Sequence, residues 1–100
     1  MIEICNLRNE KHSEPWDFKI DRTTPLGNPF IVNGEPKRDW SCDQYDNNFE
    51  DMIKKPKVKD YLDSLIATYK IYGKLRLFCW CAPKRCHGET IKRYLEDLSE

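Results

Sequence analysis

Three cysteines and one histidine lie within nine residues of one another, at Cys79, Cys81, Cys86 and His87. Thiolates and imidazoles are the ligands that zinc prefers, so these residue types fit a metal site. A thiolate is also a nucleophile, and its pKa falls beside cationic groups or at a helix N-terminus. The imidazole of His87 could serve as an acid, a base or a ligand donor. The stretch therefore indicates a metal site, a reactive thiol or a polar binding site.

The residues around this stretch predict a strand that leads through a short loop into a helix. Apolar side chains occupy both faces near the end of residues 74–81, as in a central strand, and Pro83 stops the strand. Helical spacing follows Gly88, at Ile91, Tyr94, Leu95 and Leu98. Cys86 and His87 are therefore expected at a helix N-terminus, beyond the carboxyl end of a strand. Open α/β sheets bind ligands there, because free N–H groups and the helix dipole favour anions.

The spacing of the cysteines weakens the metal and thiol interpretations. A zinc site would use Cys79, Cys81, Cys86 and His87, but structural zinc sites usually place two to four residues between paired ligands. Zinc is therefore kept as an alternative, and no cofactor is favoured. Lys84 and Arg85 would favour the thiolate form of a nearby cysteine, so Cys86 or His87 could serve an enzyme. The chain has no phosphatase loop and no recognisable triad, which leaves open whether the protein is an enzyme.

The favoured interpretation is a site for a phosphorylated small molecule. Backbone N–H groups around Gly88, together with Arg85 or His87, could hold a phosphate. An aromatic ring such as that of Trp80 or Phe30 could stack on a base, although the alternation of apolar residues places Trp80 in the core.

The amino-terminal half of the chain predicts two strands and an ordered loop. Residues 2–7 are mostly apolar, and apolar residues alternate with charged residues over 16–20. Between them, residues 9–15 are charged and predict a turn. Two prolines, a glycine and an asparagine predict an ordered loop over residues 22–30, and Ile31–Val32 could form a very short strand.

Two helices are expected before the central strand. The first covers residues 37–55 and is broken by Pro56, and the second carries a clear apolar stripe and ends at Gly73. Residues 1–100 are therefore expected to form a single α/β domain, with a three- or four-stranded sheet packed with about three helices. The direction of the first two strands is left open.

Composition and charge narrow the class of protein. The formal net charge is zero, which argues against broad electrostatic binding of nucleic acid. Residues 1–50 carry six Lys/Arg against ten Asp/Glu, whereas residues 51–100 carry eleven against seven. No signal peptide and no bilayer-crossing run are recognised, so we expect a cytoplasmic protein without a membrane partner. Its five cysteines are an odd number and are expected to be reduced.

The chain resembles the family called domain of unknown function 4326. The resemblance covers about residues 2–98 and rests on Arg22, Gly27-Asn28-Pro29-Phe30, Arg38, Tyr45, Cys79-Trp80-Cys81-Ala82-Pro83 and Cys86-His87-Gly88. The chain has extra residues between Arg22 and Gly27 relative to the usual pattern. The resemblance implies an α/β fold in a short bacterial, archaeal or viral protein, with no settled activity. It selects Arg22, Asn28, Arg38, Cys79, Cys81, Cys86 and His87.

These observations predict a module that binds a nucleotide-like or other phosphorylated ligand. In a phage it could sequester a host signalling nucleotide in the host cytoplasm. His87 and the helix start around Gly88 would take the phosphate, Arg22 and Arg38 would neutralise charge, and Asn28 would fix the orientation. A pocket shared between copies in a homo-oligomer is plausible for so short a chain.

Two alternatives come from other classes of protein. One is an enzyme that acts on a nucleotide or nucleoside through Cys86 or His87, and the other is a zinc-stabilised interaction domain. If the binding interpretation holds, Asn28→Ala or His87→Ala should abolish ligand binding with little loss of folding.

Overall fold

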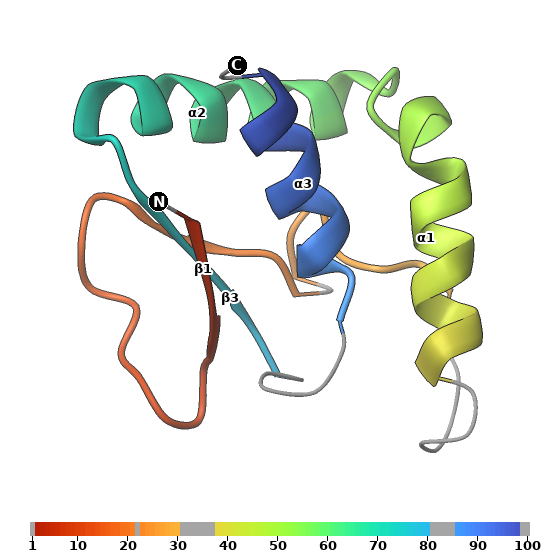
Figure 1. Ribbon diagram of the computed structural model, residues 1–100, viewed down its shortest axis with the longest axis horizontal. Helices are drawn as coiled ribbons and strands as arrows, with labels where there is room; N and C mark the ends of the chain where they lie inside the picture. Colours follow the sequence, from red (N-terminus) through yellow and green to blue (C-terminus); the bar gives the residue numbers. More distant parts are fainter. Residues whose placement is uncertain (1, 22, 31–37, 81–85, 99–100) are drawn as a thin grey trace.

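The computed structural model describes residues 2–21, 23–30, 38–80 and 86–98 and forms an α/β domain (Figure 1). Its elements are β1 (Ile2–Asn6), β2 (Asp17–Lys19), α1 (Arg38–Met52), α2 (Pro56–Tyr72), β3 (Leu75–Cys79) and α3 (Gly88–Leu98). The predicted α/β class is confirmed, and the described residues form a sheet of three strands. The predicted strand at Ile31–Val32 lies outside the described residues.

All three strands run parallel, in the order β1-β3-β2. Leu77 of β3 is the common register point, because it pairs with Ile4 of β1 and with Phe18 of β2. The prediction of a central strand is therefore confirmed, and Leu77 and Phe78 are fully buried on opposite faces. The prediction that Trp80 lies in the core is wrong. The strand ends at Cys79, and the Trp80 side chain beyond it is 54% exposed.

One face of the sheet packs against the helices and carries the main core. Leu75, Leu77 and Cys79 alternate along β3 and join a cluster of buried side chains from all three helices. The helices reach the sheet at different places: α2 packs against β3, α3 packs against β1, and α1 packs against α3 (Figure 1). The predicted stripe of α2 is confirmed, with Val58, Leu62 and Leu65 buried. This arrangement fixes the start of α3 beside the carboxyl ends of the strands.

The other face of the sheet is covered by the loop that joins β1 to β2. This loop must cross β3, because β1 and β2 are parallel and lie on either side of it. The His12 ring packs edge-on against Phe78 with 5.7 Å between centroids. The Arg76 side chain lies on the same face, with its guanidinium carbon 5.1 Å from the Phe78 centroid. The loop takes the place that a second helical layer has in larger α/β folds.

An ion pair between the buried carboxylate of Asp17 and the partly exposed guanidinium of Arg76 anchors this loop to the sheet. Arg76 Nε donates to Asp17 Oδ1 and Arg76 Nη2 donates to Asp17 Oδ2, both at 2.8 Å. The same carboxylate accepts the backbone N–H groups of Ser13 at 3.0 Å and Glu14 at 2.9 Å. Burial raises the pKa of the Asp17 carboxyl, but the hydrogen bonds from Arg76 and from these two amides outweigh burial, and the pKa is lowered.

The first helix ends three residues earlier than predicted, at Met52. The turn that follows leads to Pro56, which opens α2 in its first turn instead of only breaking the preceding helix. The predicted end of α2 is confirmed, because Gly73 adopts a left-handed conformation with φ 71° and its N–H donates to Tyr69 O.

We expect Gly73→Ala to lower the free energy of unfolding by about 1 kcal/mol, because a Cβ is disfavoured at positive φ. No atom lies within 4 Å of the place where the Cβ would be, so the expected cost comes from the backbone alone. Urea titration measures the change. Gly73→Asn is the matched control, since asparagine tolerates this conformation and should cost less. An equal loss in both variants would contradict the explanation.

Candidate functional site

The structure brings Cys79, Cys86 and His87 together, as their predicted places at the strand end and the helix start require. The Sγ atoms of Cys79 and Cys86 lie 3.3 Å apart. All three side chains are buried, with 1% of Cys79, 4% of Cys86 and 7% of His87 exposed. The cluster is therefore part of the core at the start of α3, with little surface open to a large ligand.

His87 links the start of α3 to two other segments. Its Nε2 atom forms a short hydrogen bond with the backbone carbonyl of Ile20, just after β2. Its ring packs on the Tyr45 ring of α1 with 4.9 Å between centroids. The Tyr45 hydroxyl in turn donates to the carbonyl of Leu26 at 2.8 Å. Burial raises the pKa of Tyr45, so its phenol stays protonated and can keep this bond.

The N–H groups at the start of α3 already have partners inside the protein. Gly88 N donates to Cys86 Sγ at 3.3 Å, Glu89 N donates to Cys86 O at 3.2 Å, and Thr90 N donates to His87 O at 3.1 Å. Gly88 is packed so closely that a Cβ would lie 2.8 Å from Ile20 Cδ1. Phosphate binding by His87 and Gly88 stays a prediction, and a ligand there would have to compete with these bonds.

Asn28 holds the loop before α1 in place. Its Nδ2 donates to Ser41 Oγ at 2.9 Å, and its Oδ1 accepts the N–H of Phe30 at 2.8 Å. Ser41 Oγ donates to Phe30 O at 2.5 Å, which completes the link between the loop and α1. The proposed role of Asn28 in orienting a ligand stays a prediction, and its replacement would also disturb this link.

Four other predicted site groups cannot be placed. Arg22, Cys81 and Arg85 lie outside the described residues, and so does the side chain of Arg38 at the start of α1. Among the residues that the structure describes, no group of three or more His, Cys, Asp or Glu side chains could hold a metal ion. Because the alternative zinc set includes Cys81, the zinc interpretation stays untested.

A second place for chemistry lies at the carboxyl edge of the sheet, where the connections after β1 and β3 separate. The loop after β1 covers one face, while α3, which follows β3, packs on the other. At the junction, Leu7 N donates to Cys79 O at 2.9 Å and Asn6 Nδ2 donates to Trp80 O at 3.3 Å. Such a divergence of connections is where open α/β sheets bind ligands.

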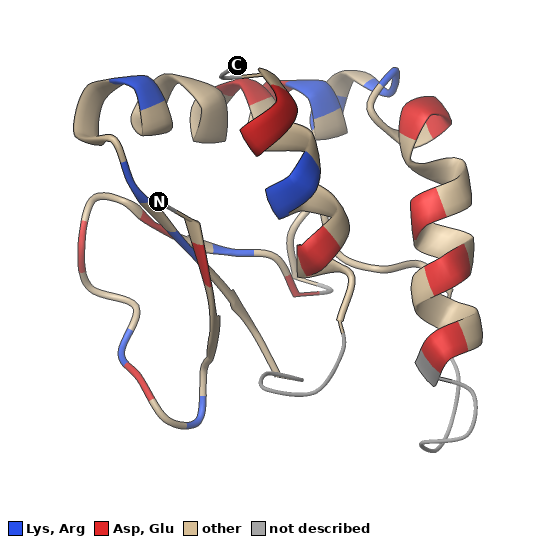
Figure 2. Ribbon diagram, viewed as in Figure 1, with Lys and Arg blue, Asp and Glu red and all other residues tan. Residues whose placement is uncertain are grey.

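A hollow of about 560 Å³ opens beside this junction. It is lined by Leu7, Arg8, Asn9, Glu10, Lys11, His12, Ser13 and Lys19. Three of these residues are lysine or arginine and one is glutamate, so the lining carries a positive excess. Figure 2 shows basic positions along the loop between β1 and β2. A concave, positively charged lining of this kind attracts anions.

The hollow of about 560 Å³ is called the basic hollow. The exposed indole of Trp80 lies next to it, on the far side of Arg8. The Arg8 guanidinium carbon lies 6.0 Å from the Trp80 ring centroid, and Arg8 also lines the hollow. Trp80 Nε1 donates to Asp21 Oδ2 at 3.1 Å, which fixes the orientation of the indole. Burial raises the pKa of Asp21, but hydrogen bonds from Thr23 and from this indole help to lower it overall, so the carboxylate is ionised at neutral pH.

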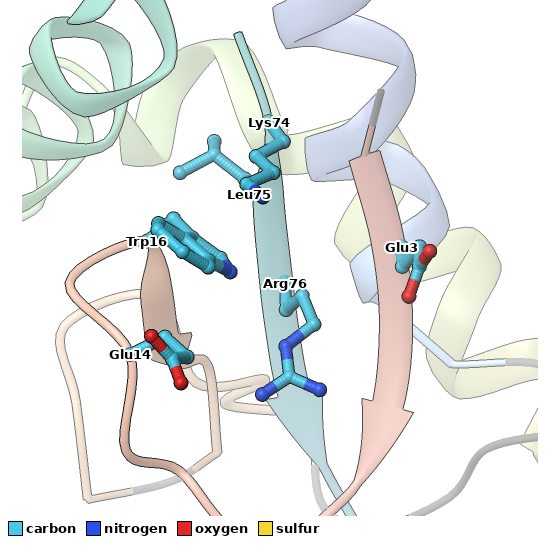
Figure 3. Close-up of a pocket in the computed structure, with 6 residues that line it drawn as sticks. All are labelled: Glu3, Glu14, Trp16, Lys74, Leu75 and Arg76. Carbon is cyan, nitrogen blue, oxygen red and sulfur yellow. The ribbon is translucent and has the colours of Figure 1, made fainter. Parts of the chain in front are cut away.

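A second hollow, of about 340 Å³, lies at the opposite edge of the sheet (Figure 3). It is lined by Glu3, Glu14, Trp16, Lys74, Leu75 and Arg76. Its two acidic and two basic residues balance, and Arg76 is already paired with Asp17. Lys74 Nζ lies 3.9 Å above the centroid of the Trp16 ring, so this cation already makes a cation–π contact. The amino ends of the strands therefore offer a weaker anion site than the carboxyl ends.

Comparison with known proteins confirms the resemblance at the level of the family. The profile of the Domain of unknown function (DUF4326) matches residues 5–97. The chain belongs to the DUF4326 family. An uncharacterized 12.4 kDa protein in the nrdA-td intergenic region of Enterobacteria phage T4 is 28% identical to it over 96 residues. This match covers 95% of the chain and 81% of the T4 protein, and no solved structure matches the chain.

Two features of this DUF4326 domain were not predicted from its sequence. The basic residues Arg8, Lys11 and Lys19 fall in a charged turn and on a strand, where their convergence on one hollow depends on how the loop crosses the sheet. Trp80 is exposed, although its shared period with Phe78 predicts a place in the core. The run of charged residues directly after the first strand is the signal that could have indicated the hollow. None of the described helices is both long and apolar enough to cross a bilayer.

Proposed function

We propose that this DUF4326 protein binds a small phosphorylated ligand of nucleotide type at the carboxyl edge of its sheet, in the cytoplasm. The observation that carries the proposal is the basic hollow beside the exposed indole of Trp80. This location differs from the helix start favoured by the sequence, because the N–H groups of α3 are used inside the protein.

The basic lining suits the phosphate groups of such a ligand. Positively charged hydrogen-bond donors are provided by Arg8, Lys11 and Lys19. Charge-assisted hydrogen bonds to phosphate are among the stronger polar contacts. His12 adds a further ring nitrogen from the same loop. Glu10 lowers the positive excess but leaves it in place. A ligand with one or more phosphates is therefore favoured over a neutral one.

The indole of Trp80 suits the base of a nucleotide. About half of this side chain is exposed, and its hydrogen bond to Asp21 holds the ring in one orientation. A planar base can stack on such a ring with little loss of side-chain freedom. Arg8 lies between the ring and the hollow, so stacking and phosphate contacts could be made by one ligand.

Binding without conversion fits this set of contacts best, because charge pairing and stacking hold a ligand but break no bond. The chain has a relative in phage T4, which favours a viral setting for the proposal. A phage protein that binds a host signalling nucleotide would lower its free concentration in the host cytoplasm. Sequestration is therefore the use that we propose for the site.

The proposal is tested by calorimetric titration of the full chain with ADP, AMP, adenosine and inorganic phosphate. We expect ADP to bind more tightly than either adenosine or phosphate, because only ADP makes both kinds of contact. Arg8→Gln should weaken ADP binding about tenfold, the value of a charge-assisted hydrogen bond. Trp80→Ala should weaken it by about fivefold to a hundredfold, the range of one stacked base.

Lys57→Gln is the control, because Lys57 is an exposed cation on α2 away from the hollow, and its variant should bind ADP like the wild type. Two results would overturn the proposal: no binding of any of these probes at millimolar concentration, or an ADP affinity that is the same in Arg8→Gln, Trp80→Ala and the wild type. Tests at His87 are less clear, since its burial means that His87→Ala would perturb folding as well.

A further inference from the structure

We propose that Cys79 and Cys86 form an intramolecular disulfide when a hydroperoxide reaches Cys86. The two thiols are not used in the proposed ligand site. They come from different elements, since Cys79 ends β3 and Cys86 lies two residues before α3. Their Sγ atoms are 3.3 Å apart, so a bond of about 2.05 Å needs an approach of only about 1.3 Å.

Among the hollows lined by described residues, one reaches Cys86 and none reaches Cys79. Cys86 lines a hollow of about 160 Å³ between α1 and α3, together with Cys42, Asp46, Glu89, Thr90 and Arg93. Cys79 is 1% exposed and is not part of this lining, so it lies behind Cys86. The proposal therefore makes Cys86 the thiol that meets the oxidant and Cys79 the thiol that reacts second.

Two contacts of Cys86 favour its nucleophilic form, while its burial and the carboxylates of Asp46 and Glu89 oppose it. Its sulfur accepts the N–H of Gly88 at 3.3 Å, and it lies at the positive end of the α3 dipole. Both contacts stabilise a thiolate relative to a thiol. Cys5 provides a contrast inside the same protein. Burial and the neighbouring Glu10 raise the pKa of Cys5 to about 12, so its thiol stays protonated and unreactive.

The size and charge of the hollow select the oxidant. A volume of about 160 Å³ holds a few molecules the size of water, each of which occupies about 30 Å³ in the liquid. Asp46 and Glu89 at the lining disfavour an anion, and Arg93 is already paired with Asp46. A large, negatively charged oxidant such as glutathione disulfide is therefore disfavoured, whereas neutral hydrogen peroxide fits.

The reaction balances in two steps. The Cys86 thiolate attacks one oxygen of hydrogen peroxide, the O–O bond breaks, and the leaving hydroxide takes a proton to give water and a sulfenic acid at Cys86. The Cys79 sulfur then attacks the Cys86 sulfur, the S–O bond breaks, and the departing hydroxide takes the Cys79 proton as a second water. Two thiols and one peroxide thus give one disulfide and two waters.

The test uses the reduced full chain treated with hydrogen peroxide, followed by blocking of free thiols, trypsin digestion and mass spectrometry. Lys84 and Arg85 separate the two cysteines, so trypsin leaves them on different peptides that only a disulfide can join. Cys81 lies on the same peptide as Cys79, and the experiment is therefore done in a Cys81→Ser background. We expect a linked pair of peptides and the loss of two free thiols.

Two variants separate the roles of the thiols. Cys79→Ala should retain a sulfenic acid at Cys86 that dimedone labels, while Cys86→Ala should give neither a label at Cys79 nor a linked peptide. Cys42→Ser should leave the linkage unchanged. The proposal is overturned if peroxide consumes no thiols, if the link joins Cys86 to Cys42, or if dimedone labels Cys79 in preference to Cys86. Circular dichroism before treatment confirms that each variant is folded.

Discussion

Replacing Asp17 with alanine is expected to lower the free energy of unfolding by about 3–5 kcal/mol, the usual cost of removing one partner of a buried ion pair. The Asp17 side chain is fully buried, and it accepts two hydrogen bonds from Arg76 and two from backbone N–H groups of the β1–β2 loop. All four donors would lose the carboxylate, although Arg76 Nη2 would keep the carbonyl of Lys11 at 3.5 Å. Urea denaturation followed by circular dichroism measures the loss.

Two controls make this result specific to the pair. Asp63→Ala removes an exposed carboxylate from α2 and should change the stability by less than about 0.5 kcal/mol. Asp17→Ala combined with Arg76→Met should recover part of the loss, because the unpaired cation is then gone. If Asp17→Ala costs no more than Asp63→Ala, the ion pair does not hold the loop on the sheet.

The same pair gives a pH dependence with a definite sign. The pKa of Asp17 is lower in the folded chain than in the unfolded chain, where it is about 3.9. Its contribution is therefore fully present above the unfolded pKa and is lost as the pH falls through the folded pKa. The stability difference between the wild type and Asp17→Asn should shrink from pH 6 to below pH 3. A difference that grows on acidification would contradict the lowered pKa.

Replacing Tyr45 with alanine is the second change with a large expected effect, about 3–5 kcal/mol. Tyr45 is fully buried in α1, and its ring packs on His87 and on Phe49. Its hydroxyl also holds the carbonyl of Leu26, so the side chain connects α1, the start of α3 and the loop before α1. Thermal unfolding should show the loss as a lowered Tm.

Tyr45→Phe separates the ring from the hydroxyl. It keeps the packing but leaves the carbonyl of Leu26 without this donor, and we expect a loss of about 1–2 kcal/mol. Tyr72→Phe is the matched control, because Tyr72 is 45% exposed and loses a hydroxyl without a comparable buried contact. If Tyr45→Ala and Tyr45→Phe lower the Tm equally, the ring packing contributes little and the connection rests on the hydroxyl alone.

The elements themselves could be predicted from the sequence because their signals are local. Alternation of apolar residues identifies β3, the helical spacing after Gly88 identifies α3, and the left-handed glycine at position 73 marks the end of α2. The proximity of Cys79 to Cys86 and His87 could also be predicted, because a short loop joins the end of the strand to the start of the helix. Each of these features depends on residues close together in the chain.

The features that could not be predicted from the sequence depend on contacts between residues far apart in the chain. The Asp17–Arg76 pair joins positions 59 residues apart, and the local sequence around either residue does not indicate which residue it pairs with. The loop after β1 covers the face opposite the helices because β1 and β2 are parallel on either side of β3, and strand direction has no local signature. That crossing brings together the basic residues that line the hollow.

The exposure of individual side chains was decided in the same way. Alternation indicates that a residue can face a neighbouring layer, but it does not say whether a layer is present there. Trp80 therefore lies in the open just past the end of β3, while His87 is covered by Tyr45 and bonded to Ile20. The sequence by itself determined which segments are strands and helices and which groups could react. Only the tertiary structure decided which of those groups face solvent, because burial depends on how distant segments pack.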